Sequence, residues 1–303
     1  MKQHIKIFSL VLLLLAASAA RAHYDSTEMG WNSEKRKTMA RSYPLTDQSR
    51  VSIKNSFGNV TVLNWNRNEV KVEITITVKA NSDEAASAIL DAISIDEKKG
   101  TDISFETKFR SRTNNGRGKS SSMQIDYVVN IPATTRLKIT NSFGNTVIPD
   151  RSGATELSQS YGDLTTGSLA NTERLSVDFG KLVTGELENT RVHVKFSKVE
   201  IDKLSGNFDG NFQFCTKPSI SFTPAIKNVN IETKYSDLTI SLPKSFDANI
   251  NITTSFGKIT NNSSLKLTDK DGGPLTEIRH TAPSSRTDRK ISIRSEFGKI
   301  RLQ

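Results

Sequence analysis

The sequence contains a single cysteine, Cys215, among its 303 residues. One thiol cannot form a disulfide framework, so the fold must be held by packing and by backbone hydrogen bonds. We interpret Cys215 as a small buried residue. No second long apolar run follows the one that begins at Ile7. This excludes a membrane-spanning helix from the remainder of the chain and predicts that the mature protein is soluble.

Sequence motifs of common active sites are also missing. The chain has no zinc-type pair, Walker loop, Rossmann glycine pattern, nucleophile elbow or calcium-binding nonapeptide. Beyond residue 22 there are three histidines, which we interpret as surface residues: His23, His193 and His280. We therefore expect a protein that is not an enzyme and that has no catalytic residue, cofactor or metal.

The first 22 residues have the features of a secretory signal peptide. Lys2 and Lys6 give a positive start, residues 7–17 are apolar, and Ala20-Arg21-Ala22 is a small-x-small cleavage site. We expect the mature chain to begin at His23 and to be extracytoplasmic, in the periplasm, on the cell surface or secreted. No cysteine follows the site, which disfavours a lipoprotein. Removal of Lys2, Lys6 and Arg21 lowers the net charge from +10 to +7.

An aromatic residue followed by glycine recurs along the chain. From Phe143 to Phe196, neighbouring copies are 18, 18 and 17 residues apart, and Ser197 and Ser236 replace the glycine in two copies. A fixed period indicates stacked repeats, because one repeat cannot bury its apolar face alone. The copies are centred on eight aromatic residues: Phe57, Phe143, Tyr161, Phe179, Phe196, Tyr235, Phe256 and Phe297.

Apolar residues alternate with polar ones before each aromatic, as in Val51 and Ile53 before Phe57. Such alternation predicts a strand with one buried face. A repeat of about 18 residues is too short for a propeller blade, which needs roughly 40–45. We predict a mainly β protein, a right-handed parallel β-solenoid (β-helix or β-roll) with the eight aromatics stacked in its core. Phe179→Ala is then expected to cost about 3–5 kcal/mol. An antiparallel meander would explain the alternation but not the identical bends.

The residues between Phe57 and Phe143 have a different pattern, which indicates an insertion at about residues 70–132. It begins with an alternating strand, residues 70–78, followed by Ser82 as a helix N-cap. The helix is expected over residues 85–93, with Ala85, Ala88, Ile89 and Ala92 on its buried face. Two more strands, residues 101–109 and 123–131, are expected to form a hairpin around the Ser/Asn/Gly-rich residues 110–122.

The positive net charge favours acidic glycans or anionic lipid headgroups as partners, although it also serves solubility. The sharpest basic cluster is the loop with Arg110, Arg112, Arg117 and Lys119, a candidate site for an anionic partner. Aromatic residues do not interleave with it, so we expect no nucleic acid.

A glycan-active parallel β-helix enzyme is the competing hypothesis, because such enzymes set carboxylates on neighbouring coils. Here the position before each aromatic has mixed charge, for example Asp178, Lys195 and Glu296. This mixture disfavours an acidic catalytic cluster.

The order of these segments, with Asn55-Ser56-Phe57-Gly58-Asn59 opening the repeats, resembles the bacterial putative-adhesin, head-GIN-like family of envelope β-solenoid proteins found in Bacteroidota. The resemblance covers residues 50–303 and implies a non-enzymatic adhesin or a structural module whose partner is an envelope glycan or another envelope protein. It implies a signal peptide (1–22), an N-terminal extended segment (23–50) and one adhesin-like body (51–303), with a monomer favoured.

The chain reaches residue 303 on a complete repeat, which would leave an open strand edge. We expect the segment of residues 260–290 to fold back over that end. Docking of a second protomer or another envelope protein is the alternative. On the N-terminal side, the predicted helix is a candidate cap.

Overall fold

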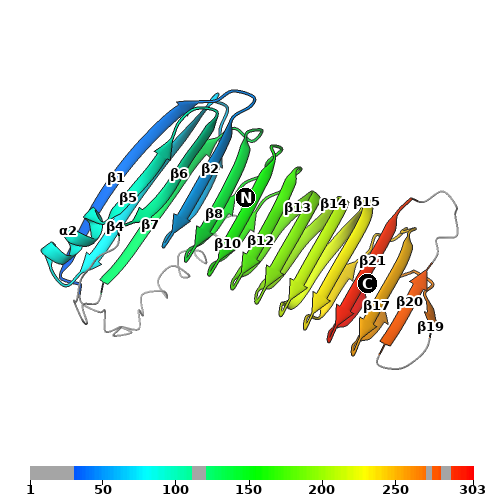
Figure 1. The fold of residues 1–303 in the computed structure, drawn as a ribbon. Coiled ribbons are helices and arrows are strands. Elements are labelled where there is room, and N and C mark those ends of the chain that lie inside the picture. The colour runs from blue at the N-terminus through cyan, green and yellow to red at the C-terminus, as the bar shows by residue number, and fades with distance from the viewer. Residues whose placement is uncertain (1–30, 111–120, 271–274, 281–287) are drawn as a thin grey trace, which may run out of the picture.

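The computed structural model describes residues 31–110, 121–270, 275–280 and 288–303, so the expected signal peptide and cleavage site lie outside the described residues. The protein is mainly β, with strands stacked side by side along an elongated body (Figure 1). This confirms the mainly β prediction. Within the described residues, the strands join one large mixed sheet that is not closed.

The elements of the first half are β1 (Ser33–Pro44), β2 (Arg50–Ser56), β3 (Val60–Asn64), β4 (Glu69–Ala80), α2 (Asp83–Asp91), β5 (Ile93–Lys98), β6 (Asp102–Phe109), β7 (Ser121–Ile131), β8 (Arg136–Ser142), β9 (Thr146–Ile148), β10 (Thr155–Ser160) and β11 (Leu164–Thr166). The second half contains β12 (Thr172–Asp178), β13 (Lys181–Lys195), β14 (Lys198–Gln213), β15 (Thr216–Lys234), β16 (Leu238–Ser241), β17 (Asn249–Ser255), β18 (Lys258–Asn261), β19 (Thr268–Lys270), β20 (Leu275–His280), β21 (Lys290–Glu296) and β22 (Lys299–Leu302).

The central repeats pair in parallel, in two rows. The strand before each aromatic pairs with its counterpart in the next repeat, as in β2–β8, β8–β10 and β10–β12. The strand after each aromatic does the same, as in β9–β11 and β11–β13. Antiparallel pairs lie at the ends, including β1–β4, β4–β7, β5–β6 and β17–β20. The sheet is therefore mixed rather than purely parallel.

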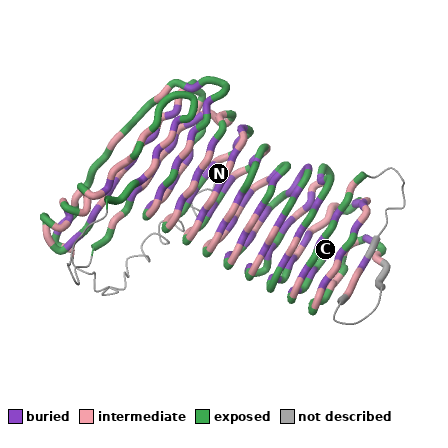
Figure 2. The backbone as a smooth tube through the Cα atoms, in the orientation of Figure 1, coloured by how far each residue is buried: buried purple, intermediate pink, exposed green. Residues whose placement is uncertain are grey.

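Side-chain alternation places one apolar core along the body. In β2, Val51 and Ile53 are buried while Ser52 and Lys54 are more exposed. Figure 2 shows the same alternation of buried and exposed residues along the stacked strands. Leu182 and Val199 continue the core on the strands that follow the aromatics. Apolar burial is the main favourable term in folding, so these repeats stabilise one another.

The glycine that follows six of the nine aromatics allows the backbones of adjacent repeats to approach closely. A Cβ atom built on Gly162 would lie 2.0 Å from the carbonyl oxygen of Gly144, and one on Gly180 would lie 2.0 Å from the carbonyl oxygen of Gly162. Real Cβ atoms do not approach backbone so closely. The recurring glycine is thus required by the stacking distance at this bend.

The N-terminal part differs from the predicted insertion in its pairing. Strand β4 confirms the alternating strand, and β6 and β7 lie where two strands were expected. The predicted hairpin is wrong: β6 pairs with β2 and β5, whereas β7 pairs with β3 and β4. Strands β1 and β5, which the sequence interpretation did not contain, complete this end because they provide antiparallel partners for β4 and β6.

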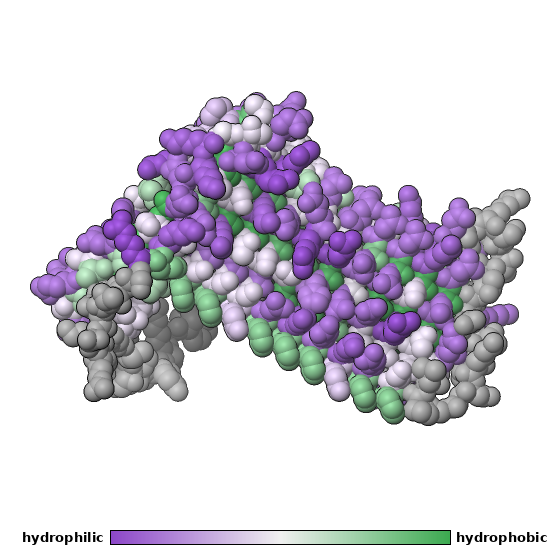
Figure 3. Space-filling view, viewed as in Figure 1, coloured by the Kyte–Doolittle hydropathy of each residue, from purple (hydrophilic) through white to green (hydrophobic). Residues whose placement is uncertain are grey.

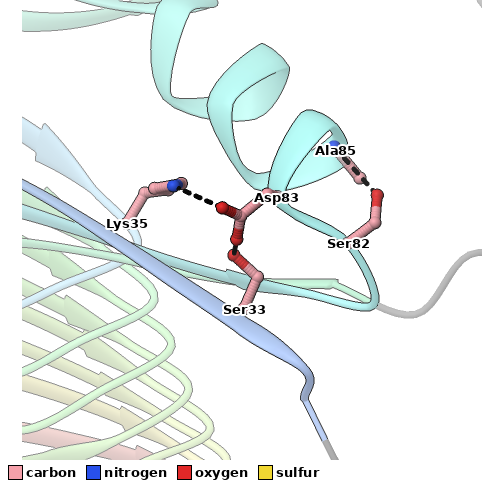
Figure 4. Close-up of polar contacts among 5 residues, drawn as sticks. All are labelled: Ser33, Lys35, Ser82, Asp83 and Ala85. Carbon is pink, nitrogen blue, oxygen red and sulfur yellow. Dashed lines mark hydrogen bonds and ion pairs between the residues drawn. The ribbon is translucent and has the colours of Figure 1, made fainter.

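Helix α2 packs on β1, β4 and β5. Its buried residue is Ala86, and Ala85, Ile89 and Leu90 are half-buried against the core. Ala88 is exposed, so the predicted face was wrong by a rotation about the helix axis. Asp83 in the first turn accepts hydrogen bonds from the Lys35 ammonium and the Ser33 hydroxyl (Figure 4). These two donors lower the pKa of the Asp83 carboxyl, the Lys35 hydrogen bond most strongly.

Ser82 caps the helix as predicted, because its Oγ accepts a hydrogen bond from the Ala85 backbone N–H at 3.2 Å (Figure 4). Loss of an N-cap leaves this donor without its partner, so Ser82→Ala should lower the free energy of unfolding by about 1 kcal/mol. Urea denaturation measures this change. The control is Ser87→Ala within the helix, where alanine has the better helix propensity and no loss is expected. A control that loses as much as Ser82→Ala would contradict the capping role.

The last repeat in sequence is not the last in space. Strand β21 lies between β15 and β17, pairing in parallel with both. Strand β22 likewise lies between β16 and β18. The end of the stack is therefore β17, and β20 covers its edge as an antiparallel partner, with β19 beyond it. Within the segment of residues 260–290 that was expected to fold back, β20 covers a strand edge. That edge belongs to β17 in the preceding repeat, because the final repeat is internal.

Candidate binding surfaces

Nine aromatic side chains form a straight row that we call the aromatic ridge. Neighbouring ring centroids are 4.8–5.1 Å apart and the ring planes are within 8° of parallel. This spacing matches the distance between neighbouring strands. In spatial order the ridge consists of Phe57, Phe143, Tyr161, Phe179, Phe196, Phe214, Tyr235, Phe297 and Phe256.

The ridge lies on the outside of the protein, which corrects the predicted core ladder. Its residues are 39–64% exposed, and Phe179 is 47% exposed. Each has a positive φ, between 47° and 64°. Alternation from Val51 and Ile53 would point Phe57 inward, but the left-handed backbone conformation breaks the period of two and turns the ring outward. The expected cost of 3–5 kcal/mol for Phe179→Ala therefore no longer applies.

Phe214 is a ridge member that is missing from the eight aromatics identified in the sequence. It stacks between Phe196 and Tyr235 at 4.9 Å from each. Cys215 follows it in place of glycine and hid the motif. The distance of 18 residues from Phe196 to Phe214 was the signal that could have identified it.

Backbone hydrogen bonds hold eight of the nine ridge residues against the next repeat. The backbone N–H of Phe143 donates to the carbonyl of Ser160 at 3.0 Å, and that of Tyr161 donates to the carbonyl of Asp178 at 2.9 Å. Because the rings stack face to face, their faces are covered and their edges meet solvent. Figure 3 shows apolar side chains protruding in a row along one edge of the body.

A second feature is a cleft of about 1030 Å³ in the second half of the protein, lined by residues that precede ridge aromatics by five to seven positions. Strands β13, β14, β15, β21 and β17 lie side by side beneath it. Their paired registers place one exposed row across the cleft: Arg191, Asp209, Asn230, Ser292 and Asn251. We call this feature the asparagine cleft.

A second row at the cleft contains asparagines linked by side-chain amides. Asn189 Oδ1 accepts hydrogen bonds from the backbone N–H of Asn207 at 3.0 Å and from its side-chain amide at 3.4 Å. Asn207 Oδ1 accepts one from Asn228 Nδ2 at 3.0 Å. Asn189, Asn207, Asn228 and Asn249 each precede a ridge aromatic by seven residues, a periodic signal in the sequence that could have revealed the row.

Most of the basic loop predicted as a site for an anionic partner lies outside the described residues, so that site stays a prediction. Arg110 is exposed directly after β6, whereas Arg112, Arg117 and Lys119 lie outside the described residues. His193 is half-buried on β13, and burial lowers the pKa of its imidazole. Cys215 is buried, which raises the pKa of its thiol.

Among the residues that the structure describes, no group of three or more His, Cys, Asp or Glu side chains could hold a metal ion. Nor does that part of the chain contain a helix long and apolar enough to cross a membrane.

Comparison with known proteins finds no matching family model and no matching curated protein. Solved structures similar to this chain include a putative adhesin from Bacteroides fragilis, with 11% identity and a TM-score of 0.45, covering 88% of this chain and 97% of that one. A putative adhesin from Parabacteroides merdae has 10% identity and a TM-score of 0.39, covering 88% and 96%. A putative cell adhesion protein from Clostridium sporogenes has 14% identity and a TM-score of 0.22, covering 88% and 99%.

Proposed function

We propose that this chain is an extracytoplasmic, non-enzymatic binding protein of the adhesin type that holds an envelope glycan in the asparagine cleft. The observation that carries the proposal is the pair of polar rows across five adjacent strands. A side-chain amide offers two donors and one acceptor oxygen, so it can bind sugar hydroxyls in either direction. Asn230 and Asn251 are exposed in the cleft and point away from the core.

The body that carries this cleft is, in our proposal, a right-handed parallel β-solenoid. The two rows of parallel pairs and the one-to-one stacking of equivalent residues support it. Rigid strands hold the polar rows at the fixed spacing of about 4.8 Å between neighbours. A repeating ligand such as a polysaccharide can meet such a surface at several points, and weak contacts then add up to useful affinity.

The competing proposal is a glycan-cleaving enzyme, which would require two carboxylates flanking the bound sugar. The carboxylates at the cleft are Glu173 and Asp209. Asp209 Oδ2 lies 3.6 Å from Arg191 Nε, so this carboxylate is engaged in an ion pair with the neighbouring strand. This pairing supports binding rather than catalysis.

Binding to an array of neutral and acidic oligosaccharides tests the proposal. The double variant Asn230→Ala/Asn251→Ala removes two exposed amides and should weaken glycan binding at least tenfold, because several hydrogen bonds are lost at about 1 kcal/mol each. The control Asn66→Ala/Asn262→Ala removes two exposed asparagines elsewhere and should leave binding unchanged. If the wild type binds none of the oligosaccharides, or both variants bind alike, the cleft is not the site. Cleavage of a bound oligosaccharide would refute the non-enzymatic assignment.

A further inference from the structure

We propose that the aromatic ridge is a second, independent binding surface that docks the protein onto an anionic lipid bilayer. The ridge is a continuous apolar strip, one ring wide and roughly 40 Å long at the ~4.8 Å spacing of neighbouring strands. Exposed apolar strips of this size in a protein are characteristic of interaction surfaces. The asparagine cleft is lined by residues that precede the ridge aromatics by five to seven positions, so the two surfaces use different residues.

The ring orientation selects the kind of partner. Aromatic faces, on which a sugar would stack, are covered by the neighbouring rings along the ridge. What remains exposed is a line of ring edges, which carry the positive part of the aromatic quadrupole. Ring edges suit the headgroup level of a bilayer, where aromatic side chains are enriched at the boundary between water and hydrocarbon.

The straightness of the ridge also fits a flat partner. All nine residues share one backbone conformation, and each ring plane lies within 8° of the plane of its neighbour. In eight of the nine residues a backbone hydrogen bond to the adjacent repeat holds the main chain that carries the ring. A planar surface can therefore touch many rings at once without any rearrangement of the protein, which avoids an ordering cost on binding.

Charge beside the ridge favours an anionic surface. Six lysines directly precede the aromatics or follow them by two residues: Lys181, Lys195, Lys198, Lys234, Lys258 and Lys299. Four carboxylates occupy equivalent positions: Asp163, Asp178, Asp237 and Glu296. Glu296 pairs with Lys234 at 2.9 Å, and Asp237 accepts the Lys299 backbone N–H at 2.8 Å. Glu200 pairs with Lys181 at 3.2 Å and with Lys198 at 2.7 Å, so the excess of positive charge beside the ridge is small.

The lysines lie mainly along the half of the ridge from Phe179 to Phe256. A second copy with its ridge parallel to the first would place lysines against lysines in that half, which opposes this arrangement of two copies. A bilayer containing acidic lipids would instead attract them.

Flotation of the exported protein with phosphatidylcholine vesicles, with and without phosphatidylglycerol, tests the proposal. The wild type should float with the phosphatidylglycerol vesicles and much less with phosphatidylcholine alone, and added salt should weaken this binding. The triple variant Phe179→Asn/Phe196→Asn/Phe214→Asn should lose at least tenfold in vesicle binding. Asparagine tolerates the left-handed backbone conformation at these positions, so the variant is expected to fold, and its thermal unfolding transition checks this.

A matched control is Leu63→Asn/Val147→Asn, which removes two exposed apolar side chains outside the ridge, each 46% exposed in the wild type. It should bind vesicles like the wild type.

Equal vesicle binding by the folded triple variant and the wild type, or no wild-type binding to anionic vesicles, would overturn the proposal. A wild-type dimer in sedimentation that the triple variant abolishes would also overturn it, because the occupant of the ridge would then be a second copy. Oligosaccharide binding by the triple variant should be unchanged. The vesicle experiment can therefore contradict the proposed role of the ridge without contradicting glycan binding in the asparagine cleft.

Discussion

Phe212→Ala should lower the free energy of unfolding by about 3–5 kcal/mol, the cost of deleting an aromatic side chain from a packed core. Phe212 is completely buried in β14, whereas Phe214, two residues later, is 47% exposed in the ridge. Phe214→Asn should cost only about 1–2 kcal/mol. It loses two stacking contacts at about 0.5–1.5 kcal/mol each, and asparagine relieves part of the left-handed backbone strain.

Urea denaturation of the two variants measures this difference between neighbours of the same residue type. Comparing the two variants distinguishes the buried aromatic position from the exposed one, and the comparison requires no ligand. If Phe214→Asn is as destabilising as Phe212→Ala, the ridge carries much more packing energy than its exposure implies. If Phe212→Ala is the milder variant, the assignment of the inner and outer aromatic rows is wrong.

Gly162→Ala is expected to cost about 3 kcal/mol or more, a large effect for the addition of one methyl group. The added Cβ would lie 2.0 Å from the carbonyl oxygen and 2.7 Å from the carbonyl carbon of Gly144. These are backbone atoms of a neighbouring repeat, so relief requires the repeats to separate and the stacking of Phe143 on Tyr161 to loosen. Overpacking against atoms that cannot move is a recognised source of severe destabilisation.

The control for Gly162→Ala is Cys215→Ala, at the same position of another repeat. There the structure already accommodates a Cβ atom. Cys215→Ala removes only the thiol, so the free energy of unfolding should fall by only about 1 kcal/mol. Midpoints of thermal or urea unfolding compare the two variants. A Gly162→Ala protein as stable as Cys215→Ala would show that the bends can separate at little cost and that the glycine is retained for another reason.

Local patterns in the sequence predicted several features correctly. Alternation before each aromatic predicted the strands, and the Ser82 cap followed by two acidic residues predicted the start of α2. These features depend on residues close together in the chain. The helix face and the hairpin were predicted incorrectly, because Ala86 and the β6 and β7 pairings are decided by strands distant in sequence.

The candidate surfaces were partly encoded in the sequence. The aromatic period was visible, and the same period repeats in Asn189, Asn207 and Asn228, seven residues before ridge aromatics. The direction of the rings was not predictable from alternation, because a positive φ at a single bend residue reverses the side of the strand that follows from counting.

By itself, the sequence determined a mainly β protein built from repeats of about 18 residues, with small residues at the bends, because hydrophobic period and bend chemistry are local properties. Only the tertiary structure decided that the aromatics lie outside, that the asparagines and charges of five strands line one cleft, and that β21 lies between β15 and β17. Each of these depends on backbone hydrogen bonds and close approach between residues far apart in the chain. The order of strands in space and the conformation at a bend follow from which partners pair, and no local pattern specifies the partner.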